Sequence, residues 1–581
     1  MDESAAMQLR RAALLHTRAE IGREINTLVP IACLPDELLA EVFAFWVAQS
    51  QHDAPSTDSA EELDLLWEDI YPSYAWIRIA HVCHHWRTVA LQTPRLWSTF
   101  MIDTEELAVE LLARSKQAPL HLEIHNTSQV DILWDPLQEQ MHHVESMTVV
   151  NYASTTVPSH YDCMRAAPEL RRLHIAVDDD SVGFHWHAAS EDDYYSTPFD
   201  NVHVPCLTTL HFKNTPVSWL SPLFKTSLTH LLFTLPCPWP NLRNQDIVNV
   251  LQALKQMPQL QWLVLANTLP DTPDSNSRVY AHLHETFPSL SYLKLIGSTS
   301  AIWCLLKHMS FPATTRLTLT CTDDHREQLE LLVPLIAEKL RGTSQPGQSP
   351  GPFLSASSTD RRFCAWRQDL NIATPATLAN DLPGSPKPDV ELAVNNGSTH
   401  PAQDGNMFLA VCGAFPLREA RTLYVGSGSH RTAPQRIALV ATLKLCMPKV
   451  HSLAMGQSLA SNVLPILLLT GVGRGQELVE PVFPELDTIV LHALQIPDSE
   501  GHRIGSFRHG LKGRRAEGYG VRRVLFRECR GKVVLQLRES LEKDGIVEVD
   551  TDLTETLQRR RFGLNLDNDF LDIEISSADE D

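Results

Sequence analysis

One short phrase recurs along the chain and restricts its fold more than any other feature: proline, any residue, Leu, two residues, Leu, any residue, then Leu, Ile or Phe. The final two apolar positions are two residues apart and share one face of a short strand, while the proline ends the preceding helix. A spacing of roughly 20 to 40 residues is typical of stacked repeat proteins. Copies begin at residues 168 (PELRRLHI), 205 (PCLTTLHF), 258 (PQLQWLVL), 288 (PSLSYLKL), 448 (PKVHSLAM) and 484 (PELDTIVL), with degenerate copies at 227 and 312.

Segments between these copies, such as 246–257 and 326–340, carry the periodicity of helices. One strand and one helix per repeat, stacked side by side, bury a continuous core. The sequence therefore predicts an α/β fold, with a small N-terminal all-helical module followed by an irregular leucine-rich-repeat-like solenoid of short parallel strands and helices. The solenoid is expected in two parts, at 115–340 and 408–564.

Residues 341–407 break the pattern with a run rich in Pro, Gly, Ser and Asn. Such a composition buries too little apolar surface to offset the entropy of ordering the chain, so a disordered linker or insertion is predicted. Because the phrase appears on both sides of it, we expect this segment to interrupt one solenoid and not to separate two domains. The acidic tail at 565–581 is predicted to fray.

Residues 1–30 are predicted to form an amphipathic helix. Leu14, Ile21 and Leu28 recur at seven-residue steps, with Ile25 beside them and charged residues over much of the remaining surface. This spacing fits a short coiled coil. Docking of the helix on the following domain is the simpler interpretation, and both remain open.

The stretch LPDELLAEVFAFW, 34–46, predicts a second helix. Pro35 suits the first helical position, and the two acidic residues after it lie where the helix dipole favours negative charge. Residues 49–72 are polar and acidic and are predicted to be a loop insertion. The expected apolar face of the helix consists of Leu38, Leu39, Val42 and Trp46.

Residues 76–97 carry three tryptophans. The residue before Pro94 is disfavoured in a helix, so the helix is expected to end by Thr93, after which Leu96 and Trp97 fold back and close a small core. The apolar side of this helix has three- and four-residue steps and comprises Trp76, Ile79, Val82, Cys83, Trp86, Val89 and Ala90.

Charge and cysteine usage limit the classes of partner. A formal net charge of -21 argues against a general binder of nucleic acid or anionic membranes. The 11 cysteines form no C-x-x-C pair, which disfavours a zinc ribbon or a dense disulfide framework and favours reduced thiols. The longest apolar run, near Leu467, is too short to span a bilayer. We therefore expect a protein of the cytoplasm, the nucleus or both.

Signals for chemistry are weak. His185 and His187 in HWH share one side of an extended chain, near Asp178–Asp180 and Asp192, so a metal site is conceivable, although an acidic surface loop is favoured. The glycine runs at 426 and 471 complete no nucleotide-binding motif. The basic run at 502–523 has few aromatics, which favours a mobile loop over a nucleic-acid site. No metal, cofactor or enzymatic activity is predicted.

The two helical stretches together resemble an F-box. The family pattern runs Leu-Pro-x-Glu, an apolar helix, Val-Cys-x-x-Trp-Arg and a closing Leu-Trp. The insertion at 49–72 departs from the tight connection of a typical F-box. The matching positions are Leu34, Pro35 and Glu37, then Val82, Cys83, Trp86 and Arg87, and finally Leu96 and Trp97.

The resemblance implies a non-catalytic substrate receptor. F-box proteins dock on a Skp-type adaptor, and through it on a cullin-RING ubiquitin ligase, while the C-terminal domain holds a protein substrate. By this resemblance the F-box core contains Val82, Cys83 and Trp86. The alternative is a leucine-rich interaction scaffold without ligase assembly. The residues implied to bind the adaptor are Leu34, Pro35, Leu38, Leu39, Val42 and Trp97.

Residues that alternate outward from the phrase strands are the candidates for substrate binding. Trp262 and Tyr292 occupy the same position in successive phrases and are expected to be exposed neighbours, unless an outer loop covers both rings. Lys and Arg beside them would suit an acidic or phosphorylated segment. The full set of candidates is Arg172, His174, His211, Trp262, Tyr292, Lys294 and Arg316.

Overall fold

The chain forms two compact units in the computed structural model, Met1–Pro270 with Asp274–Leu290 and Asp271–Pro273 with Ser291–Asp581. Each unit is described by itself. The residues described are 3–51, 74–102, 104–126, 134–151, 167–177, 202–215, 217–235, 247–269, 284–323, 326–341, 350–359, 361–370, 386–394, 405–426, 433–456, 463–468, 481–492, 502–527, 529 and 532–545.

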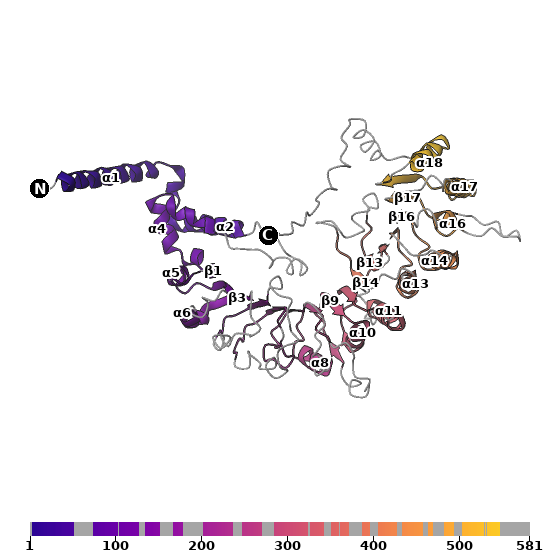
Figure 1. Cartoon of the computed structure of the whole chain (residues 1–581), viewed down its shortest axis with the longest axis horizontal. Helices are drawn as coiled ribbons and strands as arrows, with labels where there is room; N and C mark the ends of the chain where they lie inside the picture. The colour runs from indigo at the N-terminus through magenta and orange to yellow at the C-terminus, as the bar shows by residue number, and fades with distance from the viewer. Residues whose placement is uncertain are drawn as a thin grey trace, which may run out of the picture. The chain divides into compact units, whose positions relative to one another are not determined.

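The first unit begins with helices (Figure 1). Leu39, Phe43 and Val47 of α2 are buried together with Trp76 and Trp97, and these residues form a small helical core. Of the predicted acidic insertion at 49–72, residues 49–51 belong to α2 and the rest lies outside the described residues. The elements are α1 (Glu3–Thr27), η1 (Pro30–Cys33), α2 (Asp36–Gln51), η2 (Tyr74–His81), α4 (His84–Gln92) and η3 (Pro94–Trp97).

The helix predicted from Trp76 to Thr93 is two helices. Cys83 has an extended backbone between η2 and α4, with φ of -156° and ψ of 172°. The backbone N–H of Trp86 donates to its Sγ over 3.4 Å, so Cys83 caps α4. A single helical periodicity therefore does not run through this segment.

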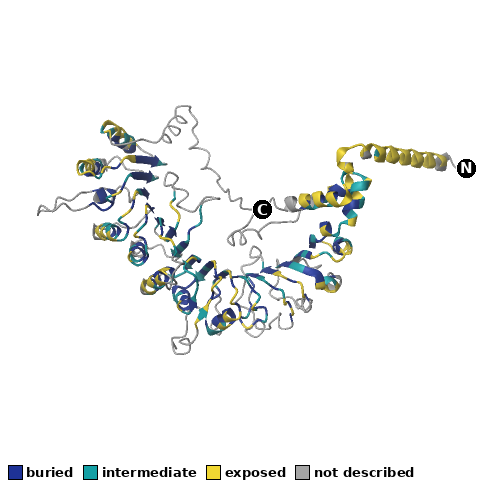
Figure 2. Ribbon diagram, turned by 180° about the vertical axis from the view of Figure 1, so that it is seen from behind, coloured by how far each residue is buried: buried dark blue, intermediate teal, exposed yellow. Residues whose placement is uncertain are grey.

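Helix α1 does not dock on the module that follows it, contrary to the simpler interpretation of its sequence. Every described residue from Ala6 to Asn26 is exposed except Gly22, and Figure 2 shows α1 almost entirely in the colour of exposed residues. It meets η1 at its C-terminal end. Its apolar stripe is left on the surface.

The remainder of the first unit stacks parallel strands in chain order. The helices lie to one side of these strands (Figure 1). The strands are β1 (Thr99–Ile102), β2 (Leu120–Asn126), β3 (Val144–Asn151), β4 (Arg172–Val177), β5 (Thr209–Lys213), β6 (His230–Thr234) and β7 (Trp262–Ala266), followed by the short β8 (Glu285–Thr286). The helices are α5 (Glu105–Ser115), α6 (Trp134–Gln140), η5 (Met141–His143) and α8 (Ile247–Lys255).

The recurring phrase has the predicted structure in the described residues. Each copy leads directly into a strand, from β4 to β7 in the first unit and in β9, β11, β16 and β17 in the second. The second Leu of each phrase is paired in register with the next, and all are buried beneath the sheet: Leu173, Leu210, Leu231 and Leu263. The first Leu of each phrase is buried in the turn below: Leu170, Leu207, Leu228 and Leu260.

The second unit continues the alternation of strands and helices. Its helices line one side of its strands (Figure 1). The strands are β9 (Tyr292–Gly297), β10 (Met309–Ser310), β11 (Arg316–Cys321), β12 (Ser355–Ser358), β13 (Arg362–Trp366), β14 (Val390–Val394), β15 (Thr422–Val425), β16 (Ser452–Gly456), β17 (Thr488–His492) and β18 (Arg523–Arg527). The helices are α10 (Thr299–Lys307), α11 (Arg326–Arg341), α13 (Gly405–Ala414), α14 (Ala433–Cys446), α16 (Leu464–Leu468), α17 (His502–Ala516) and α18 (Lys532–Lys543).

The segment 341–407 contains three strands, so the prediction of a disordered segment is wrong for β12, β13 and β14. The strand order in the second unit is β9-β11-β14-β13-β12-β15-β16-β17-β18. Strand β13 is antiparallel to both neighbours, which corrects the expectation of parallel strands throughout. Because β14 pairs with β11 and β12 pairs with β15, the sheet runs through the segment without a break. Its other parts, 342–349, 371–385 and 395–404, lie outside the described residues.

The basic run is also structured, contrary to the mobile loop that was expected. Residues 502–516 form α17, and Arg508 and Lys512 both pair with the carboxylate of Asp544 beyond α18. Arg514 is fully buried and donates from Nε to the carbonyl oxygen of Tyr519 over 3.3 Å. Arg508 and Lys512 thus connect α17 to the residue after α18, while Arg514 is buried inside the unit.

Helix α17 provides a test of this packing. A Cβ at Gly510 would lie 2.7 Å from Cβ of Leu468 in α16, whereas one at Gly505 would meet nothing within 4 Å. We expect Gly510→Ala to destabilise the protein by about 1–3 kcal/mol through overpacking. Gly505→Ala should stabilise it by about 1 kcal/mol, because Ala favours a helix. Denaturant unfolding of both variants is the measurement, and equal effects would contradict the close α16–α17 contact.

Candidate interaction surfaces

Helix α2 presents four large apolar side chains to solvent. Leu38, Val42, Phe45 and Trp46 are 54%, 46%, 71% and 56% exposed. They recur at three- and four-residue steps and so lie on one side of the helix, which we call the α2 apolar face. Three other apolar residues of the helix, each four residues from the next, are buried in the core instead: Leu39, Phe43 and Val47. The α2 helix is therefore apolar on two sides, and only one of them is used by the fold.

Two polar side-chain contacts link α2 to the elements that pack against it. Asp36 Oδ1 lies 3.6 Å from His85 Nε2 on α4, and Glu41 Oε1 lies 3.5 Å from Arg95 Nη1 on η3. All four side chains are well exposed, so each pair contributes little to stability. They connect α2 to α4 and η3 and leave the α2 apolar face uncovered.

The residues expected to bind an adaptor divide into accessible and buried sets. Pro35, Leu38 and Val42 are exposed, and Leu34 is half-buried. Leu39 and Trp97 are buried, so neither can meet a partner in this fold, and that part of the prediction is wrong.

Trp97 is buried because three neighbours enclose it. Its ring packs edge-on to Trp76 at 5.0 Å, and the Arg114 guanidinium lies 4.4 Å over its ring. Its Nε1 donates to the carbonyl oxygen of Ala90 over 2.8 Å. A closing tryptophan with its polar atom satisfied inside belongs to the core and not to an interface.

The expected F-box core residues also differ in placement. Val82 is 59% exposed, because the break at Cys83 removes it from the apolar side of α4. Trp86 is half-buried, with its ring 5.1 Å from that of Phe43. Thus Cys83 caps a helix, Trp86 packs on α2, and Val82 adds an apolar side chain to the surface.

The substrate candidates of the first unit share one face of the sheet, in two rows set by the strand register. The outer row contains Ser146, Arg172, Thr209, His230 and Trp262 and is partly accessible. The central row contains Thr148, His174, His211, Leu232 and Val264 and is buried.

His174 and His211 are thus on the predicted face but are not accessible. Their rings stack at 4.2 Å with an interplanar angle of 15°. Burial, together with His211 and Lys213, holds the pKa of His174 well below its ordinary value. His174 is therefore neutral at neutral pH, and positive charge on this face comes from Arg172 and from the half-buried Lys213, two residues after His211 on β5.

The outer row keeps accessible groups that can recognise a partner. Arg172 Nη2 lies 3.5 Å from Nδ1 of His121. Burial is the larger cause that lowers the pKa of His121, and the positive charge of Arg172 is the smaller one. The negative charge of Glu145 partly offsets this shift. At the other end of the row the rings of His230 and Trp262 are parallel, with centroids 6.1 Å apart. A guanidinium at one end and a stacked aromatic platform at the other form a mixed polar and aromatic surface.

The candidates of the second unit are less accessible than expected. Tyr292 is buried, so its role as an exposed aromatic anchor is wrong, while Lys294 and Arg316 are half-exposed. Trp262 belongs to the first unit and Tyr292 to the second, and only Trp262 is accessible. Strand register places Lys294 beside Thr318, and Arg316 beside Tyr292.

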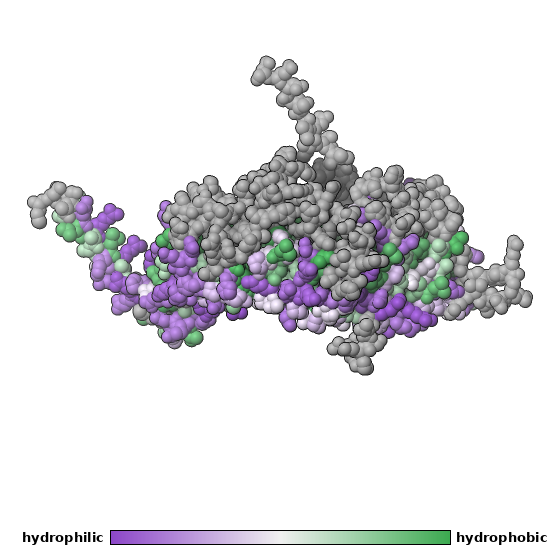
Figure 3. Space-filling model, turned by 90° about the horizontal axis from the view of Figure 1, so that it is seen from below, coloured by the Kyte–Doolittle hydropathy of each residue, from purple (hydrophilic) through white to green (hydrophobic). Residues whose placement is uncertain are grey.

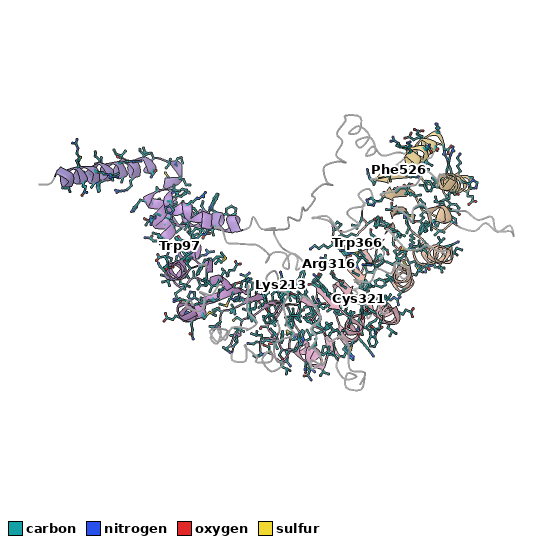
Figure 4. All side chains as sticks on the ribbon, in the orientation of Figure 1. Trp97, Lys213, Arg316, Cys321, Trp366 and Phe526 are labelled. Atoms are coloured by element: carbon teal, nitrogen blue, oxygen red, sulfur yellow. The ribbon has the colours of Figure 1, made fainter. Side chains whose placement is uncertain are left out.

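Several residues on the same face of the second unit were missed from the sequence. Arg362 and Glu391 form an ion pair of 2.6 Å on β13 and β14. A buried cluster of Cys364, Trp366, Tyr424, Ala454, Val490 and Leu525 follows along the sheet, and Figure 4 marks Arg316 and Trp366 on this unit. The available signal was the apolar run in RFCAW and the alternating apolar residues of VELAV, within a segment whose average composition is polar.

Within the described ranges no group of three or more His, Cys, Asp or Glu side chains could hold a metal ion. In the same ranges no helix has the length and hydropathy needed to cross a membrane. His185, His187, Asp178–Asp180 and Asp192 lie outside the described residues, as does the glycine run at 471.

Comparisons with known proteins assign the chain to no family. No protein-family model matches the sequence, and no curated protein matches it. Among solved structures, the leucine-rich repeat-containing protein LegL7 from Legionella pneumophila is similar at 10% identity and a TM-score of 0.24, over 71% of this chain and 98% of LegL7. The description as stacked parallel strands and helices therefore rests on the register and burial given above.

The buried histidine stack makes the stability of the first unit depend on pH. Folding lowers the pKa of His174 below 6.5, so the unfolded chain binds more protons and stability falls as the pH falls below about 6.5. Each such histidine contributes at most about 1.4 kcal/mol per pH unit. Denaturant unfolding between pH 7.5 and 5.5 should show a shallower loss for His174→Leu than for wild type, with exposed His203→Leu as control. An unchanged pH slope in His174→Leu would contradict this account.

Proposed function

We propose that the chain is the substrate-recognition subunit of a Skp–cullin–F-box type ubiquitin ligase. The helical module at 31–100 binds the adaptor, and the strand face of the repeat domain binds a protein substrate. The observation that carries the proposal is the α2 apolar face, exposed on a module whose sequence follows the F-box pattern. In this proposal the protein acts in the cytoplasm, the nucleus or both, where cullin-based ligases work.

The α2 apolar face has the composition of a docking surface. Soluble proteins rarely expose a contiguous cluster of large apolar side chains unless it is used. Binding energy concentrates on aromatic anchors, and this face contains Phe45 and Trp46 beside Leu38 and Val42. Pro35 is exposed at the start of the same helix, so the start of the F-box pattern and this face are accessible along one element.

The proposed mechanism needs no catalytic residue in this chain. A ligase transfers ubiquitin to a substrate held beside it, and one chain that holds both adaptor and substrate raises their effective concentration. On the substrate side, Arg172 and the His230–Trp262 platform in the first unit suit an acidic or phosphorylated segment. Lys294 and Arg316 supply positive charge on the corresponding face of the second unit.

Val42 and Val109 provide a matched test of adaptor docking, since both are 46% exposed and both lie on helices of the first unit. We expect Val42→Glu to weaken binding to a purified Skp-type adaptor at least about tenfold, because a charge in an apolar interface must be desolvated. Val109→Glu on α5 should bind as wild type does. Calorimetric titration measures the affinity, and both variants should keep the wild-type melting temperature.

Leu39→Ala is the control for folding, because Leu39 lies in the core and not on the α2 apolar face. Leu39 is fully buried, so its loss should cost about 2–5 kcal/mol of stability. Normal adaptor affinity in folded Val42→Glu would remove the α2 apolar face from the proposal. Failure of the wild-type chain to bind the adaptor would favour the alternative, a leucine-rich interaction scaffold without ligase assembly.

A further inference from the structure

Helix α1 exposes a large apolar surface that the proposed function does not use. Figure 3 shows apolar side chains beside polar ones on this helix, at the left of the view. In proteins most helical stability comes from packing of an apolar face against another element. The exposed apolar residues are Met7, Leu9, Leu14, Leu15, Ile21, Ile25 and Leu28.

We infer that α1 pairs with α1 of a second copy of this chain, in an antiparallel and two-fold symmetric arrangement. The helix has four arginines and three glutamates, so its net charge is too small to favour an anionic membrane strongly. Its own module leaves it uncovered. A second copy offers the same stripe, and a two-fold interface requires a surface that complements itself.

The apolar stripe has the spacing of a heptad repeat. Met7, Leu14, Ile21 and Leu28 recur every seven residues, and the intervening core positions of the heptad are Arg11, Arg18 and Ile25. In a parallel pair each of these positions meets its own copy. Arg11 would then face Arg11, and Arg18 would face Arg18, which places like charges in contact at two core layers.

An antiparallel pair removes this conflict, because each intervening position then meets a residue of the apolar row. Arg18 of one chain packs its aliphatic stem on Leu14 of the other, and Arg11 packs on Ile21. In the same alignment Met7 meets Ile25. The guanidinium groups extend past the apolar layer into water.

Charges on the flank also favour this direction. Arg10, Thr17 and Glu24 lie along one edge of the stripe at seven-residue steps. In the antiparallel alignment this edge faces the same edge of the second chain, so Arg10 of each chain lies beside Glu24 of the other. In a parallel pair this edge faces Leu15 and Gly22, and no charge is matched.

The test uses the full-length chain and its mass in solution. Sedimentation velocity over a range of concentrations should show a reversible dimer. Glu24→Arg and Arg10→Glu should each weaken dimerisation about tenfold, since two symmetric pairs become repulsive. The double variant R10E/E24R should restore it. Arg23→Glu, on the opposite side of the helix, should leave the dimer unchanged.

Orientation is tested by disulfide formation in a Cys33→Ser background, because Cys33 is exposed. A mixture of R10C chains and E24C chains should form mixed disulfides under mild oxidation, while neither variant alone should cross-link efficiently. A chain that stays monomeric at all concentrations overturns the inference. Efficient cross-linking of R11C to itself in the same background would show a parallel pair, since only in that arrangement does Arg11 face its own copy, and would overturn the antiparallel arrangement.

Discussion

The structure depends on apolar side chains that repeat in register across neighbouring parallel strands. Leu173, Leu210, Leu231 and Leu263 pair along the first unit, each buried by the strands beside it. One strand and its helix cannot bury these leucines alone, so each repeat is stable only because another is stacked on it. The opposite face of the strands is thereby left to carry polar and aromatic groups in ordered rows.

In the N-terminal module, helix α2 likewise has one side in the core and another side on the surface. One side of α2 forms the core with Trp76 and Trp97, and an adjacent side carries the α2 apolar face. The charges at Asp36 and Glu41 tie the helix to α4 and η3 at its accessible edge. In the proposed function, the α2 apolar face would hold one partner and the strand face of the sheet would hold another.

The repeating phrase was enough to predict the strands that it leads into, β4–β7, β9, β11, β16 and β17, because its proline and its paired leucines act locally. The sequence also predicted which residues point away from the leucine core, since side chains alternate along a strand. Exposure was not predictable in this way: His174, His211 and Tyr292 lie on the expected face but are buried. Alternation identifies a face and says nothing of what covers it.

The misplaced residues have specific physical causes. Val82 kept a helical spacing with Trp86, yet the Cys83 cap interrupts the helix between them. Strands β12 to β14 were missed because they are short and lie between Pro- and Gly-rich stretches, so the average composition suggested disorder. Trp97 was predicted from the Pro94 break to close the small core, and its contacts with Trp76, Ala90 and Arg114 confirm this, whereas the interface role taken from the F-box resemblance is wrong.

Amide hydrogen exchange of the full-length chain, with and without a purified Skp-type adaptor, tests the central claim most directly. The account predicts that the adaptor slows exchange in α2 and at the η2–α4 junction around Val82, while exchange in β4–β7 is unchanged. Because the α2 apolar face is exposed in the free chain, protection there reports contact with the partner. Unchanged exchange in α2 with the adaptor bound, or protection only in the strands, would contradict it.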